Sequence, residues 1–248
     1  PFVYGIADAG TNCKAVGRRV IVPTGNFLAW MGENAFYIYD GTVREIPCDV
    51  HDYVFDNLNV PGKGACWGGH NSNFNEIWWG FPSGDTQYAP NKYVIWNYAQ
   101  NVWSIGELDR GCWIDQGVFN YPISADSSGF VYEHESTLLG NSPNLNGRSP
   151  FCTTGPIQIG QGDRYVQCNQ IIPDEEASSL PGVTLSFKGK FTPLGPETDF
   201  GSFTFDSSDG YTDARFTARQ VEMTVTGSTT QDFQVGNIRL DVKNRGRR

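Results

Sequence analysis

Two cysteine–histidine pairs are the best set of metal ligands in the sequence. Cys48 is followed by His51 after two residues, and Cys66 by His70 after three. Thiolate and imidazole are the ligands that zinc prefers, and the 14 residues between the pairs fit the spacing of small zinc sites. A β domain of this size needs no metal to fold, however, and Cys66 lies beside Trp67, where a buried thiol would also fit. The sequence leaves both interpretations open.

A calcium site is the second metal candidate. Asp206, Asp209 and Asp213 lie around Gly210, and their carboxylates could ring a cation with hard oxygen ligands. Their spacing matches no EF-hand loop, and solvated turn residues explain the same pattern. Apart from zinc or calcium at these two places, we expect no cofactor.

Acid–base catalysis would need paired carboxylates, and Glu133 and Glu135 flank His134 in a suitable pattern. On a continuous strand, however, the two glutamates share one face while His134 points to the other. This favours a polar sheet edge. The sequence also has no Gly-x-Ser-x-Gly elbow and no phosphate-binding glycine loop. We therefore expect a protein that is not an enzyme.

Two sets of residues could contact partners. Exposed tryptophans can stack on sugar rings, although we expect packing between blades to account for most of them. The candidates are Trp78, Trp79, Trp96, Trp103 and Trp113. Because Trp78 and Trp79 are adjacent on a strand, at least one should lie in the core. A basic C-terminal segment could contact DNA or a neighbouring subunit, or could simply be solvated. It comprises Arg239, Lys243, Arg245, Arg247 and Arg248.

The composition is that of an all-β protein with a substantial core. The 248 residues are 39% hydrophobic and 14% aromatic, with 29 glycines and 14 prolines for turns. No window repeats apolar residues with helical period, and no apolar run is long enough to cross a bilayer, so we expect no stable membrane association. The net charge of −9 argues against wrapping nucleic acid, but an acidic lining would let DNA slide past. We expect the six cysteines to be free thiols.

One pattern of aromatic and β-branched runs occurs twice between Phe27 and Ile105, each time as three short strands. The first copy comprises Phe27–Gly32, Ala35–Gly41 and Val43–Ile46; the second comprises Glu76–Phe81, Lys92–Tyr98 and Val102–Ile105. A weaker third copy follows at 121–134. Antiparallel repeats near 45 residues are typical of β-propeller blades. We interpret residues 18–22 as a strand that completes an earlier blade, and the glycine-rich stretch 62–69 as a connector.

The C-terminal part alternates apolar with polar residues, as in an antiparallel sheet or sandwich. We place a propeller-like region at 1–165 and this C-terminal β region, which could close the same domain, at 166–248. Before Gly236 the apolar residues of the last strand lie at odd positions, and after it they lie at even positions. This shift predicts a β-bulge at Gly236. Residues 138–156 are expected to form a long polar loop. The turns 82–86 and 141–144 are candidates for loops that face a channel.

Several of these runs resemble tail proteins of tailed bacteriophages. The similar segments are Trp30–Gly41, Ile46–Cys48, Asp52–Asn59, Phe74–Trp79 and Val235–Val242. The nearest group is the tail nozzle, or packaged-DNA stabilisation protein, of short-tailed phages. The resemblance covers residues 26–135 well and the C-terminal strands less closely. It rests on blade motifs rather than on catalytic ones.

The resemblance implies a structural virion protein that extends the DNA channel below the head-to-tail adaptor and helps retain and then release the genome. It also implies a homo-oligomer, expected as a hexamer, that is assembled in the host cytoplasm with other tail proteins and encloses double-stranded DNA transiently. The chain is shorter than nozzle proteins generally are, so three repeats need not close a ring of blades. Two alternatives stay open: a carbohydrate- or receptor-binding propeller of a phage tail, and a secreted hydrolase.

Overall fold

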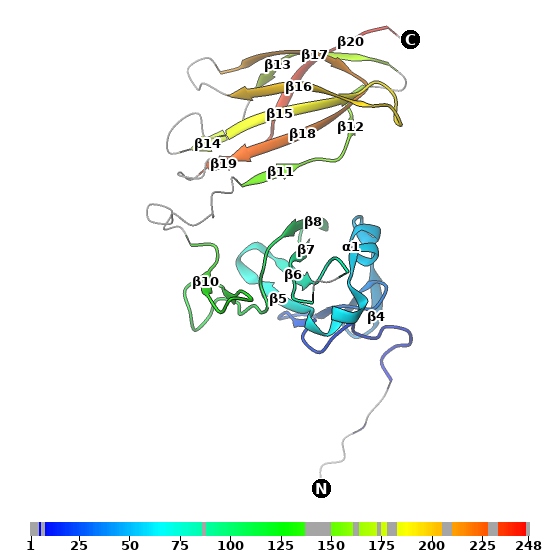
Figure 1. Cartoon of the computed structure of the whole chain (residues 1–248), viewed down its shortest axis with the longest axis vertical. Helices are drawn as coiled ribbons and strands as arrows, with labels where there is room; N and C mark the ends of the chain where they lie inside the picture. The colour runs from blue at the N-terminus through cyan, green and yellow to red at the C-terminus, as the bar shows by residue number, and fades with distance from the viewer. Residues whose placement is uncertain are drawn as a thin grey trace. The chain divides into compact units, whose positions relative to one another are not determined.

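The computed structural model is all-β and consists of antiparallel sheets, as the sequence predicts (Figure 1). The structure describes residues 5, 8–85, 88–136, 150–160, 164–172, 175–177, 183–204, 210–227 and 233–246. The chain divides into two compact units, Pro1–Ser136 and Thr137–Arg248. Within the described ranges the helices are short: α1 (His51–Asn57) and the 3-10 helices η1 (Val60–Ala65) and η2 (Ser72–Phe74). None of them has the length and apolar character needed to span a bilayer.

Unit 1 contains two four-stranded meanders, in which each strand pairs with the next one along the chain. The first sheet comprises β1 (Ile21–Pro23), β2 (Leu28–Met31), β3 (Phe36–Tyr39) and β4 (Val43–Ile46). The second comprises β5 (Trp67–Asn71), β6 (Glu76–Phe81), β7 (Lys92–Asn97) and β8 (Val102–Glu107). The predicted three-strand repeats are confirmed, but each gains an N-terminal strand. The assignment of 18–22 to an earlier blade was wrong, because β1 pairs with β2. Part of the predicted connector, 67–69, belongs to β5.

The weak third repeat forms a small sheet of β9 (Ile123–Ala125) and β10 (Val131–Glu133). Ile114 adds a bridge to Ile123 on the free side of β9. The core of unit 1 is largely aromatic, since alternate strand residues point inward. Phe36 of the first sheet meets Trp79 of the second with ring centroids 4.9 Å apart, and both side chains are fully buried.

Unit 2 has two larger sheets. One comprises β11 (Phe151–Thr153), β18 (Gln220–Gly227), β15 (Val183–Lys190) and β16 (Glu197–Thr204) in that order, with β12 (Ile157–Gln158) also paired to β18. The other comprises β17 (Thr212–Ala218), β13 (Val166–Ile172) and β20 (Arg239–Asn244), with β13 in the centre. Phe187 of β15 and Phe216 of β17 stack with centroids 5.1 Å apart, so the two sheets share a core. A further pair consists of β14 (Glu175–Ala177) and β19 (Phe233–Val235).

Two sequence-based boundaries differ from the structure. The units divide after Ser136 rather than after residue 165, because β11 and β12 pair with β18 and so belong to the C-terminal sheet. The last strand is not one bulged strand. Gly236 lies between β19 and β20, which pair with different partners, β14 and β13. The phase change therefore marks a passage from one sheet to another.

Candidate functional site

The central feature of unit 1 is strand β5, which lies between neighbours on both of its faces. Gly68 and Gly69 are adjacent on the strand and therefore face opposite sides. A Cβ at Gly68 would come within 2.6 Å of Val22 Cγ2, and one at Gly69 would overlap the Trp113 ring. The glycines thus let the first sheet approach β5 from one side and the segment around Trp113 from the other. Glycines inside a strand are a sequence signal for such close approach.

Main-chain and indole hydrogen bonds hold together this stack, which consists of the first sheet, β5 and the segment around Trp113. Gly68 N donates to Arg19 O at 2.7 Å, beside a parallel bridge between Arg19 and Trp67. On the other side, Trp67 Nε1 donates to Arg110 O at 2.6 Å, and Trp113 Nε1 donates to His70 O at 2.8 Å. The segments near residues 19–22, 67–71 and 110–114 therefore lie side by side.

The tryptophans serve this packing, which confirms the structural interpretation of most of them. Trp113 stacks on Trp78 with centroids 5.1 Å apart and an interplanar angle of 17°. Trp79 is fully buried, and Trp96 is only 6% exposed. Trp103 is half-buried and stacks on Trp96 at 5.9 Å. The five candidates do not form an exposed platform for a sugar ring.

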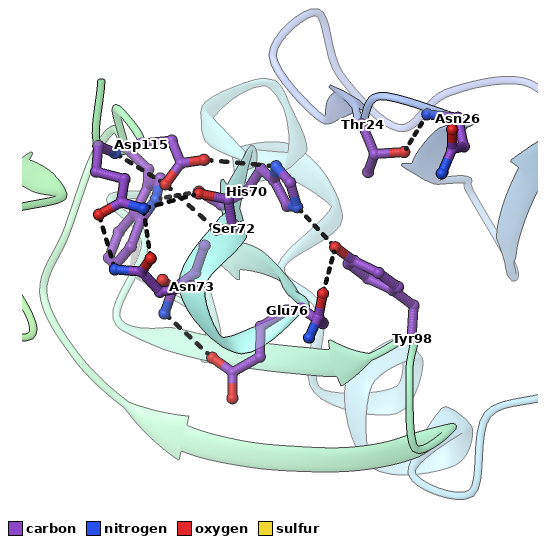
Figure 2. A network of polar contacts seen from close by, with 12 residues as sticks. Thr24, Asn26, His70, Ser72, Asn73, Glu76, Tyr98 and Asp115 are labelled. Atoms are coloured by element: carbon purple, nitrogen blue, oxygen red, sulfur yellow. Dashed lines mark hydrogen bonds and ion pairs between the residues drawn. The ribbon is translucent and has the colours of Figure 1, made fainter. Parts of the chain in front are cut away.

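A polar network extends from the end of β5 (Figure 2). His70 lies between Asp115, whose Oδ2 is 3.5 Å from Nδ1, and Tyr98, whose hydroxyl is 3.1 Å from Nε2. The Tyr98 hydroxyl donates in turn to Asn75 Oδ1, and Ser72 N donates to Asp115 Oδ1. Burial lowers the pKa of His70, an effect that the Asp115 carboxylate partly opposes. Asp115, His70 and Tyr98 lie in the order carboxylate, imidazole and hydroxyl, as in a proton relay. Asp115 and Tyr98 also bond the loop after β5, at Ser72 and Asn75, so the network has a structural role.

The expected placement of Glu133, His134 and Glu135 on one strand is wrong. Strand β10 ends at Glu133, and Glu135 has a left-handed backbone with φ 57°. Glu135 Oε1 accepts a bond from Asn71 Nδ2 at 3.3 Å. Burial, followed by the nearby Glu76 carboxylate, raises the pKa of Glu135. His134 and Glu135 therefore take part in separate contacts, whereas Glu133 is exposed at the end of β10.

His134 lies in a buried polar cluster of the third sheet. Its Nε2 is 2.6 Å from the Ser124 hydroxyl and 3.2 Å from Arg110 Nε. A serine–histidine contact can activate a nucleophile, but Ser124 is only 1% exposed and out of reach of a substrate. Burial, with a further contribution from the Arg110 cation, lowers the pKa of His134 to about 4.

The four zinc candidates do not come together. Among the described residues no group of three or more His, Cys, Asp or Glu side chains could hold a metal ion. His51 contacts Asn34 O and Asp52, and His70 belongs to the polar network. Cys66 is fully buried, and Cys48 is partly buried. The four residues therefore lie in separate environments, and Cys66 has the buried position that its neighbour Trp67 suggested.

The remaining candidates lie on the surface of unit 2 or outside the described residues. Arg239, Lys243 and Arg245 lie in or just after β20, all exposed, and Arg245 donates to Gln167 Oε1. Asp213 of the calcium candidate is in β17. Outside the described residues lie Asp206, Asp209, Thr86, residues 138–149, Arg247 and Arg248.

All six cysteines are free, as predicted, and they should differ in reactivity. Burial raises the pKa of Cys66 to about 12 and that of Cys168 to about 11, whereas Cys112 and Cys152 are exposed. Because the thiolate is the reactive form, we expect a thiol reagent at mildly alkaline pH to label Cys112 and Cys152 first. Peptide mass spectrometry after a short pulse checks the order. Early labelling of Cys66 in the folded protein would contradict it.

Comparison with known proteins gives no relative: no family model matches the sequence, and neither does any curated protein.

Proposed function

We propose that this chain is a structural component of a bacteriophage tail, of the nozzle type, in which unit 1 contributes consecutive blades of a β-propeller. The observation that carries the proposal is the position of β5, with the first sheet against one face and the segment around Trp113, which bridges to β9, against the other. Neighbouring blades of a propeller pack face to face and place their first strands nearest the axis. The parallel bridge between Arg19 and Trp67 fits this arrangement. The phage assignment in this proposal rests on the resemblance of residues 26–135 to nozzle proteins, which was noted from the sequence alone.

Both ends of the stack present apolar sheet faces, which supports assembly with further sheets. Ile21 and Leu28 lie on the face of the first sheet away from β5 and are 51% and 38% exposed. Ile114 and Val131 lie on the outward face of the third repeat and are 56% and 69% exposed. Apolar residues exposed on one face of a sheet are candidates for an interaction surface. In our proposal, neighbouring blades or subunits of a homo-oligomer, expected as a hexamer, cover them.

In the proposed assembly the oligomer continues the DNA channel below the head-to-tail adaptor, in the virion. The net charge of −9 favours passage over retention by contact with phosphates. Exposed basic residues in or just after β20, such as Arg239 and Arg245, would then contact a neighbouring tail protein or the DNA. The proposal assigns no chemical reaction to the chain.

Electron microscopy and mass photometry of the purified full chain test the proposal. The expected result is a ring-shaped oligomer with sheets arranged radially about a central passage. Exchanging Ile21 and Val131 for aspartate should dissociate this ring without unfolding unit 1, since both side chains are exposed. As a control, the same exchange at Leu194, an exposed residue of unit 2, should leave the ring intact. A monodisperse monomer without radially arranged sheets would overturn the proposal.

A further inference from the structure

The outward face of the three-stranded sheet in unit 2 forms a hollow of about 320 Å³. All of its lining residues are polar, and they come from all three strands. The opposite face of the same sheet is buried, with Cys168 and Ile171 of β13 and Phe216 of β17 in the core. The hollow is therefore a surface of one rigid sheet rather than a gap between loops.

A bulge in the central strand places two amides in this hollow. The pairing register of β13 shifts between Cys168 and Gln170. Because Cys168 and Ile171 both point into the core, Asn169 and Gln170 must both turn outward. Each amide is anchored by a carboxylate: Asn169 Nδ2 is 3.4 Å from Asp241 Oδ2, and Gln170 Nε2 is 3.3 Å from Asp213 Oδ1. The amide oxygens are thereby fixed in orientation.

Two cations flank the amides. Arg215 lies on β17 and Lys243 on β20, at opposite edges of the central strand. Within the described ranges neither of them forms an ion pair, whereas both carboxylates of the hollow already accept an amide hydrogen. The two cations and two aspartates leave the hollow with no net charge.

This lining disfavours two kinds of ligand. An apolar ligand would find no apolar lining. Binding of a polyphosphate backbone depends on attraction between phosphates and cations. Here the two carboxylates offset the two cations, so this attraction is small. A ligand rich in hydroxyl groups, in contrast, can use fixed amides and carboxylates as acceptors and donors, and guanidinium binds a carboxylate in bidentate geometry.

We propose that this hollow binds an acidic saccharide. Arg215 and Lys243 hold the carboxylate of the sugar, and the amides of Asn169 and Gln170 bond its ring hydroxyls. Binding to a single site is weak, in the millimolar range, because the hollow offers no aromatic ring for stacking. The inference does not depend on the proposed tail function.

Amide-resolved NMR titration of the full chain with trigalacturonate tests the inference, with neutral galactotriose as the second probe. We expect trigalacturonate to shift amide signals of 167–170, 213–215 and 241–243, and galactotriose to bind at least about 10-fold more weakly, the loss typical of one charge-assisted contact. Arg215→Met and Lys243→Met should each weaken trigalacturonate binding about 10-fold.

A matched control keeps the result specific. Lys188→Met removes an exposed cation from β15, outside the hollow, and should leave binding unchanged. The NMR spectrum of each variant reports whether its fold is intact. Equal binding of the two probes, shifts confined to unit 1, or no shifts at millimolar trigalacturonate would each overturn the inference.

Discussion

Replacing Gly69 by alanine should destabilise unit 1 by about 3 kcal/mol, the upper range for overpacking a core. The new Cβ would overlap the ring of Trp113. That ring cannot move aside easily, because it stacks between Trp67 and Trp78 and donates a hydrogen bond to His70 O. Urea unfolding followed by tryptophan fluorescence measures the loss. The probe is specific, since all seven tryptophans lie in unit 1, between residues 30 and 113.

Two further variants separate this clash from the general cost of changing a glycine. Gly25→Ala adds the same atom in open space and should change stability by at most about 0.5 kcal/mol. In a Trp113→Leu background, Gly69→Ala should cost clearly less than in the parent, because the overlapping ring is absent. Equal costs in both backgrounds would mean that Gly69 does not position the third repeat.

The strands with strong local signals could be predicted from the sequence. Runs such as Phe36–Tyr39 and Lys92–Asn97 are filled with aromatic and β-branched residues, and they form strands where expected. Strand β5 could not be predicted in the same way. Its sequence Trp-Gly-Gly-His-Asn has low strand propensity, and it pairs because two neighbours pack against its glycines. Tertiary packing overrides local preference at this point.

The candidate sites were harder to predict, because the decisive contacts join residues far apart in the chain. His70 meets Asp115 and Tyr98, which spacing alone does not indicate. The spacing of Cys48 and His51 suggested ligands of a zinc site, but no group of three or more metal ligands forms among the described residues. The hollow in unit 2 depends on the bulge at Asn169, in a strand whose register is set by two partners. The sequence contains its residues but no sign that they share a face.

Lowering the pH from 6.5 towards 4 should destabilise unit 1 by up to about 3 kcal/mol, through His134. Burial and Arg110 lower the pKa of His134 to about 4, from 6.5. Between these values the unfolded chain binds a proton that the folded chain does not, so stability is complete above pH 6.5 and falls as the pH falls. The slope for one group approaches about 1.4 kcal/mol per pH unit. His70, whose pKa is also lowered, acts in the same direction.

His134→Gln identifies the group responsible. Glutamine can still accept a hydrogen bond from Ser124 but does not titrate, so much of the slope between pH 6.5 and 5 should disappear. Carboxylates with lowered pKa, such as Glu33, lose their contribution only below about pH 4.5. Glu135, whose pKa is raised, acts in the opposite direction to His134 as the pH falls, and it is present in every variant compared. His51 is the matched control. Its pKa is raised, chiefly by Asp52, so its contribution is complete below pH 6.5 and is lost above that value. His51→Gln should therefore alter the stability profile above pH 6.5 and leave the loss of stability between pH 6.5 and 5 in place. If that loss disappears in His51→Gln, or persists in His134→Gln, the buried cluster around His134 is not the acid-sensitive element of unit 1.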